Sequence, residues 1–98
     1  MDFYDRAANP ISREEWVDLF ESWPDPRRVA STEVGKFWVS TVWLGIDHRF
    51  GGGGPPLIFE SMVFHDGEER DMRRYTNEDA ALAGHDQLVA AVRAGEYA

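Results

Sequence analysis

The chain has 98 residues, and its 18 Asp and Glu against 10 Lys and Arg give a formal charge of −8. A chain of this length folds as one domain, and its 43% of apolar residues, four Trp among them, exclude a disordered acidic tail. The acidity argues against non-specific binding of nucleic acid, and the lack of cysteine excludes disulfides, a thiolate nucleophile and Cys-ligated zinc. We expect a single domain over residues 1–98, with flexible ends at 1–10 and 96–98.

The first predicted element is a helix over residues 13–22. Ser12 and Glu15 have the spacing of a capping box, in which each side chain bonds the backbone amide of the other residue. Pro24 and Pro26 end the helix, because proline lacks the amide that continues it. The apolar residues between Ser12 and Pro24 recur at helical spacing and form one stripe: Trp16, Leu19, Phe20 and Trp23.

Four β-strands are predicted next, over residues 27–34, 37–46, 57–64 and 69–75. The second has the strongest strand signal, and its side chains alternate between two faces. One face carries Trp38, Ser40, Val42, Leu44 and Ile46, and the other carries Phe37, Val39, Thr41, Trp43 and Gly45. Because both faces are mostly apolar, we expect a central strand covered on both sides, or a sheet face that a second copy of the chain covers.

A second helix follows, capped by Thr76 and ended by Gly95. Acidic residues at positions 78 and 79 suit the first turn of a helix. The predicted fold is therefore α+β, with an antiparallel sheet of three to four strands between an N-terminal and a C-terminal helix, in the order α-β-β-β-β-α.

Several stretches of this chain together resemble a known group of proteins. They are 32–35 running into 38–45, then 55–60 with 62–64, and 74–76 with 80–85. Over roughly residues 4–93 the chain resembles a family of short proteins of actinobacterial phages and related bacterial genomes, which has no established activity. The resemblance implies no catalytic residue. It does imply a phage or prophage accessory protein that works in the host cytoplasm.

Each of the three histidines has an aspartate as a direct neighbour in the sequence. They are His48, His65 and His85. Imidazole and carboxylate groups together bind divalent metals. However, neighbouring side chains diverge in strands and helices, so each pair offers one ligand to a common point, and we expect neither a metal nor a cofactor. In the alternative interpretation His48 and His65 are polar residues at loop ends, and His85 packs against the sheet.

Residues 47–56 form a predicted loop rich in glycine and proline. Phosphate-binding loops open onto a helix, whereas here two prolines and a strand follow, so we reject that function. A long loop still leaves room for ligand contact. The candidates for such a binding loop are His48, Arg49, Gly52 and Gly53.

Glu60 lies among apolar neighbours in the third strand and is a possible buried acid. Perturbed carboxylates cluster at functional sites, but we favour pairing with Arg28, Arg73 or Arg74 across the sheet. The pairs Arg27–Arg28 and Arg73–Arg74 would meet only if the first and fourth strands were neighbours. They are weak signals for nucleic acid, which we do not expect as a partner.

We expect a homodimer, with an interface formed by Phe37, Val39, Trp43 and Arg73. The chain has no signal-peptide pattern and no apolar stretch near the ~20 residues that span a bilayer. We therefore expect a cytoplasmic protein without a membrane partner.

No catalytic spacing emerges, so we expect a non-enzymatic accessory protein that binds a host protein. One alternative is an acidic mimic of nucleic acid that blocks a DNA-binding or defence protein, since the excess acids lie in residues 1–26 and 76–98. A further alternative is a small metal-dependent enzyme that uses the His and Asp pairs.

Overall fold

The computed structural model describes residues 2–22, 25–47 and 54–97. It has the predicted α+β class, with two antiparallel sheets and two helices. In chain order the elements are β1 (Phe3–Tyr4), β2 (Pro10–Ile11), α1 (Arg13–Phe20), β3 (Arg28–Val34), β4 (Phe37–Trp43), β5 (Phe59–His65), β6 (Glu68–Tyr75) and α2 (Glu78–Arg93). The two-stranded sheet β1–β2 precedes α1 and was not predicted.

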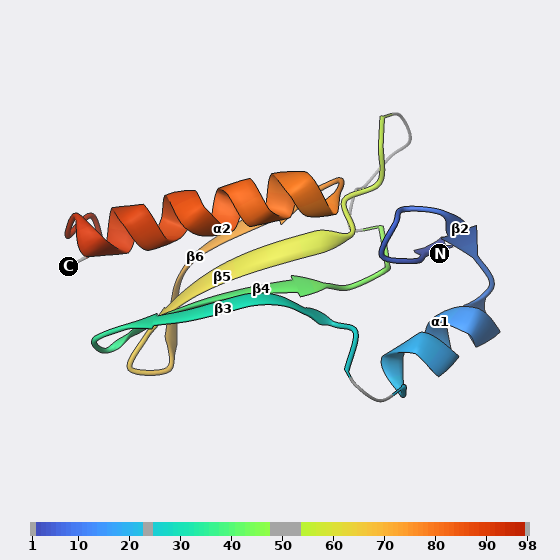
Figure 1. Ribbon diagram of the computed structural model, residues 1–98, viewed down its shortest axis with the longest axis horizontal. Coiled ribbons are helices and arrows are strands. Elements are labelled where there is room, and N and C mark those ends of the chain that lie inside the picture. Colours follow the sequence, from blue (N-terminus) through green and yellow to red (C-terminus); the bar gives the residue numbers. More distant parts are fainter. Residues whose placement is uncertain (1, 23–24, 48–53, 98) are drawn as a thin grey trace.

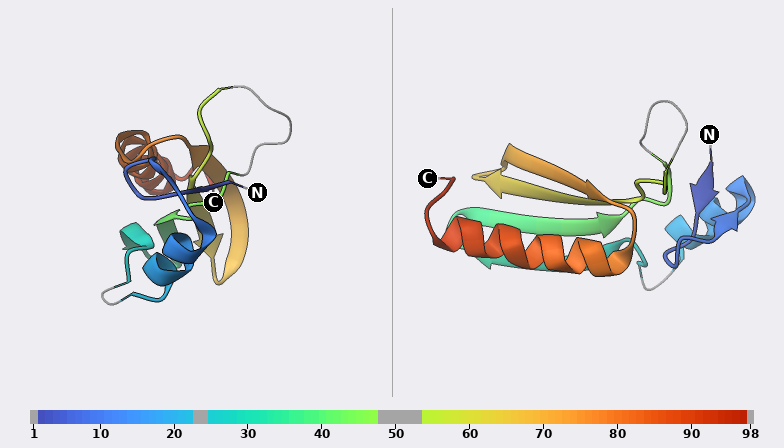
Figure 2. Two further views of the ribbon diagram at one scale, coloured as in Figure 1. Left: turned by 90° about the vertical axis from the view of Figure 1, so that its right-hand side faces the viewer. Right: turned by 90° about the horizontal axis from the view of Figure 1, so that it is seen from above.

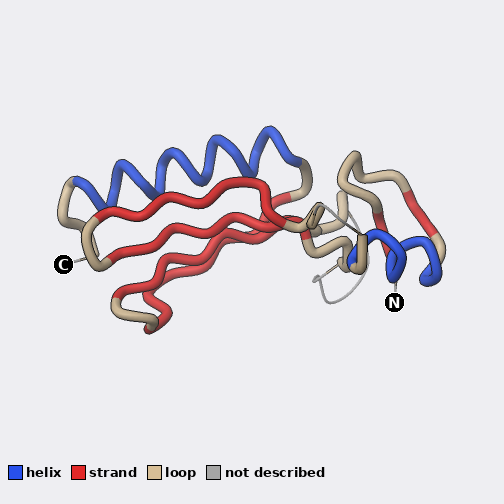
Figure 3. Tube along the Cα trace, turned by 60° about the horizontal axis from the view of Figure 1, so that its bottom comes forward, coloured by secondary structure: helices blue, strands red, loops and turns tan. Residues whose placement is uncertain are grey.

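The large sheet has the strand order β3-β4-β5-β6, with each strand antiparallel to its neighbours. Helix α2 lies along one face of this sheet and contacts all four strands (Figures 1 and 3). Helix α1 and the β1–β2 sheet lie beyond one end of the large sheet (Figures 1 and 2). No described helix therefore covers the face opposite α2.

Both helices begin as local sequence chemistry requires. Ser12 accepts a hydrogen bond of 3.1 Å from the Glu15 amide, and the Glu15 carboxylate accepts one from the Ser12 amide, which confirms the capping box. The helix ends at Phe20, two residues before the predicted end, with Glu21 as its C-cap. The cap of α2 is Asn77 and not Thr76, because the Asn77 side chain accepts the Ala80 amide at 2.8 Å.

The core lies between α2 and the sheet and continues toward α1. Apolar side chains of α2 pack on alternate residues of the strands, so one face of each inner strand is buried. The first cluster contains Val39, Val63, Leu88, Val89 and Val92. The second contains Trp43, Ile58, Phe59 and Ala81, with Trp16 and Phe20 of α1 packed against it. The second cluster thus joins the N-terminal segment to the sheet.

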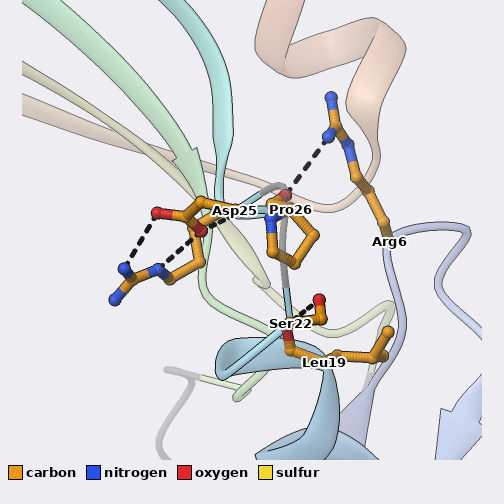
Figure 4. Close-up of polar contacts among 6 residues, drawn as sticks. Arg6, Leu19, Ser22, Asp25 and Pro26 are labelled. Atoms are coloured by element: carbon orange, nitrogen blue, oxygen red, sulfur yellow. Dashed lines mark hydrogen bonds and ion pairs between the residues drawn. The ribbon is translucent and has the colours of Figure 1, made fainter.

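Arg6 connects three separate segments of the chain. Its guanidinium donates to the Pro26 carbonyl at 3.2 Å (Figure 4) and forms an ion pair with Glu78 at the start of α2. Beside it, the Asp25 carboxylate accepts hydrogen bonds from the Arg27 guanidinium and amide, and these lower the pKa of Asp25 to about 2. These contacts hold residues 25–27, which lead into the edge strand β3.

Candidate functional site

The face of the large sheet opposite α2, which we call the outer face, is the candidate site. The strand register arranges its side chains in three cross-strand rows, because residues paired across antiparallel strands point to the same side. From the hairpin end, the first row is Glu33, Trp38, Phe64 and Glu69, the second is Ser31, Ser40, Met62 and Met72, and the third is Arg28, Val42, Glu60 and Arg74.

Trp38 is the most prominent side chain of the outer face. Its indole ring stacks on Phe64, with ring centroids 5.1 Å apart and an interplanar angle of 23°. Its indole N–H donates to the Ser31 hydroxyl at 2.8 Å. The ring is therefore held on two sides while 38% of the residue stays exposed. A fixed, exposed Trp loses little conformational entropy on binding, which is why Trp is common in binding hot spots.

The apolar surface continues from Trp38 toward β6. Met62 is half-buried and pairs with Met72, which is 39% exposed. Methionine side chains are flexible and adapt to different partners. The centre of the outer face is thus apolar, and its exposed part is adaptable.

Charged residues surround this apolar centre in an ordered way. The first row ends in carboxylates at both edge strands, whereas the third row ends in Arg28 on β3 and Arg74 on β6. Arg74 donates to the Glu60 carboxylate at 3.2 Å. An apolar centre with a polar rim is the common anatomy of protein interfaces.

A hollow of about 310 Å³ lies on the outer face along β4. Trp38, Ser40, Val42 and Leu44 line it along the strand, and Phe20, Asp25, Arg27 and Arg28 are among its other lining residues. It is therefore bounded by apolar groups and by the ion pair of the α1–β3 connection. The outer face thus combines an exposed indole with a neighbouring hollow.

The structure corrects our prediction of the interface. Phe37, Val39 and Trp43 lie on the opposite side of β4, and Val39 and Trp43 are fully buried within a single copy. Phe37 packs partly buried beside the cluster that contains Val39, and its ring contacts that of His65. The alternation along β4 was correct, but the faces were exchanged. Both faces carry Trp and Val, so composition alone does not tell which one α2 covers.

The other candidate residues also have defined places. Arg73 shares the α2 side of β6 and donates to the Gln87 side chain at 3.3 Å, so it does not belong to the outer face. Glu60 is half-buried and pairs with Arg74, one of the partners that we predicted. The loop candidates His48, Arg49, Gly52 and Gly53 lie outside the described residues.

The two arginine pairs do not meet, because β3 and β6 are the opposite edges of the sheet. Phe64 and Met72 were not singled out from the sequence, and Trp38 was expected in the core, whereas it is 38% exposed. The only signal for them was their alternation with core residues.

His85 packs against the sheet, as the alternative interpretation expected. It is only 3% exposed, and its Nδ1 and Nε2 atoms bond the Thr41 and Thr32 hydroxyls at 2.7 and 2.9 Å. The Thr41 hydroxyl in turn bonds Ser61 at 2.5 Å. Burial lowers the pKa of His85, and the weaker opposing effect of Asp86 does not cancel this shift.

In this chain of hydroxyl and imidazole groups Thr41 and Ser61 are fully buried, and Thr32 is half-buried. We assign it a structural role, in which it fixes α2 over the sheet. His65 pairs with Phe37 on β4, whereas His85 bonds Thr41 on the same strand. Phe37 and Thr41 are four residues apart, roughly 13 Å along the strand. These two histidines therefore do not converge. Within residues 2–22, 25–47 and 54–97, no three acidic or imidazole side chains are grouped in a way that could hold a metal ion.

Comparison of the chain with protein-family models, with curated proteins and with solved structures finds no match. Among the described helices, none combines the length and the apolar character needed to cross a membrane.

Proposed function

We propose that this protein is a small non-enzymatic protein that acts by protein–protein interaction through its outer face. One observation carries the proposal: Trp38 and Met72 remain 38% and 39% exposed, beside Phe64 and Met62, on the sheet face opposite α2. Contiguous apolar patches of more than about a few hundred Å² are rare on soluble monomers and mark interaction sites.

The geometry of Trp38 supports binding. An indole that is fixed by stacking and by a hydrogen bond is already in a conformation that a partner can contact, so binding costs little ordering entropy. Catalysis has less support. In the described part of the chain the hydroxyl–imidazole chain of Ser61, Thr41 and His85 is enclosed by the core.

The resemblance to actinobacterial phage proteins extends the proposal to a cellular setting. In that setting the protein is an accessory factor that works in the cytoplasm of a bacterial host. Its partner contacts the outer face and not the acidic helices, because the outer face is where apolar area is available for burial.

The test is affinity capture from an actinobacterial lysate with matched variants. Trp38→Ser with Met72→Ser removes the exposed apolar groups of the outer face. Leu82→Ser is the control, since Leu82 is equally exposed, at 40%, but lies on α2. We expect the outer-face variant to lose the captured protein while the control retains it, with unchanged circular dichroism for both. Equal capture by both variants would contradict the proposal.

A further inference from the structure

The outer face has a charge pattern that a second copy of the chain can satisfy. Acidic side chains stand at both ends of its first row, as Glu33 and Glu69, whereas the third row ends in Arg28 and Arg74. The apolar side chains lie between these charges. The face therefore carries acids at its hairpin end and arginines at its other end, where Arg74 is also paired with Glu60 of the same row and Arg28 forms no ion pair among the described residues.

A two-fold axis that runs across the strands, through the second row, matches this pattern. It turns the first row of one copy onto the third row of the other, and Met62 and Ser40 of the second row meet their own counterparts. Glu33 then faces Arg28 of the second copy at two symmetric places. An axis parallel to the strands would instead place Glu33 opposite Glu69 and Arg28 opposite Arg74, which are repulsive contacts.

The shape of the outer face agrees with the same axis. Trp38 of the first row is 38% exposed, and the hollow of about 310 Å³ that it borders also reaches Val42 of the third row. Rotation about the axis brings Trp38 of each copy over Val42 of the other. Each indole thus lies over the part of the partner's hollow that Val42 lines, and the fitting of side chains into depressions is typical of well-packed interfaces.

We propose that the outer face is the interface of a homodimer whose two-fold axis crosses the strands. This inference rests on the proposed function and names a second copy of the chain as the occupant of the outer face in the purified protein, where no host partner is present. The two sheets would pack face to face, about 10 Å apart, which long Glu and Arg side chains can bridge. The face measures roughly 19 by 23 Å, given usual strand spacings. The dimer interface is therefore small, and the association of the two copies is weak.

Glu33 and Arg28 are the most informative pair for a test. In the described part of the chain neither side chain forms an ion pair. Within one copy they lie two rows apart, roughly 13 Å along the strands. An energetic coupling between them therefore reports a contact between copies and not a contact within one chain.

The experiment measures association by sedimentation equilibrium from about 1 µM to about 1 mM, a range that covers weak dimers. We expect the unaltered protein to dimerise. Glu33→Arg and Arg28→Glu should each weaken association at least tenfold, because each puts like charges at both symmetric contacts. An equimolar mixture of the two variants should recover a dimer, since positions 33 and 28 then carry opposite charges at both contacts.

Two controls separate this pairing from the effect of net charge. Glu14→Arg and Arg13→Glu make the same charge changes on α1, where both residues are exposed, and should leave association unchanged. Moreover, Glu33→Arg reduces the net charge of −8 and would favour association if only overall repulsion mattered.

Three outcomes would overturn the inference. The mixture of variants does not recover a dimer, the two controls weaken association as strongly, or the unaltered protein stays monomeric over the whole range. If it stays monomeric while Trp38→Ser with Met72→Ser still abolishes capture from the lysate, the second copy is the wrong partner and the proposed function stands. If that variant also captures normally, both proposals fail.

Discussion

The phenol ring of Tyr75 on β6 lies against the backbone of Gly84 on α2, in the space that a side chain at position 84 would occupy. Gly84 is buried in the middle of the helix, where glycine is ordinarily unfavourable. We expect Gly84→Ala to destabilise the protein by about 1–3 kcal/mol, because the added methyl overlaps the ring and overpacking is costly. Urea unfolding monitored by circular dichroism measures the change.

The control for this prediction is Ala83→Gly, at the neighbouring exposed position of α2. It should cost about 1 kcal/mol from helix propensity alone. If Gly84→Ala instead stabilised the protein by a similar amount, propensity would dominate at both positions and the close approach of Tyr75 would be refuted.

The hydroxyl of Tyr75 gives a second expectation. It is buried and finds no hydrogen-bond partner among the described residues, so it is desolvated without compensation. We expect Tyr75→Phe to leave the free energy of unfolding unchanged or to raise it by up to about 1 kcal/mol. A loss of stability of more than about 1 kcal/mol would mean that this hydroxyl is bonded in solution.

Tyr97→Phe is the matched substitution at a hydroxyl that is bonded. Tyr97 donates to the Asp71 carboxylate at 2.6 Å, and this bond lowers the pKa of Asp71. We expect the substitution to cost about 1 kcal/mol or less, because both groups are partly exposed.

The pKa of Asp71, followed by NMR, should rise toward its ordinary value in this variant. The stabilisation that the bond gives is present above the pKa of an unfolded Asp, and it is lost as the pH falls through the lower folded pKa. An unchanged pKa of Asp71 would show that Tyr97 does not bind it.

His85 should make folding depend on pH. Burial lowers its pKa in the folded protein, so the unfolded chain binds more protons than the folded one below the ordinary His pKa of about 6.5. The contribution of neutral His85 to the free energy of unfolding is therefore fully present above that pH. It decreases as the pH drops below it, by at most about 1.4 kcal/mol per pH unit.

His85→Gln removes the titrating group while keeping a polar side chain beside the Thr41 and Thr32 hydroxyls. Urea unfolding at about pH 8, 6.5 and 5 should show a smaller loss of stability at acidic pH for this variant. His65→Gln is the control, at a half-buried position outside the hydroxyl network. A pH dependence that is lost with His65→Gln and kept with His85→Gln would contradict this account.

Local sequence signals predicted most of the fold. The Ser12 capping box and the alternating strands lie where we expected them, within a few residues. The short β1–β2 sheet was missed because two-residue strands carry no periodic signal, and it depends on contacts such as the hydrogen bond from the Tyr4 amide to the Gly45 carbonyl at 2.8 Å.

The candidate site could be predicted only in part. The alternation along β4 separated Trp38 from Val39 and Trp43, but which side α2 covers depends on long-range packing. On the covered side, the buried Thr41 hydroxyl bonds His85 of α2, and the buried Ser61 hydroxyl bonds Thr41. This pairing of distant residues favours that side for the core, and nothing local in the strand reveals it.

The most direct test of the central claim is the solvent accessibility of Met72 as the protein associates. Hydroxyl-radical footprinting with mass spectrometry measures the oxidation of Met72 relative to Leu82, which has nearly the same exposure but lies on α2. We expect this ratio to fall as the protein concentration rises, because the outer face becomes buried against a second copy. A constant ratio from dilute to concentrated protein, with both residues fully reactive, would contradict burial of the outer face by association.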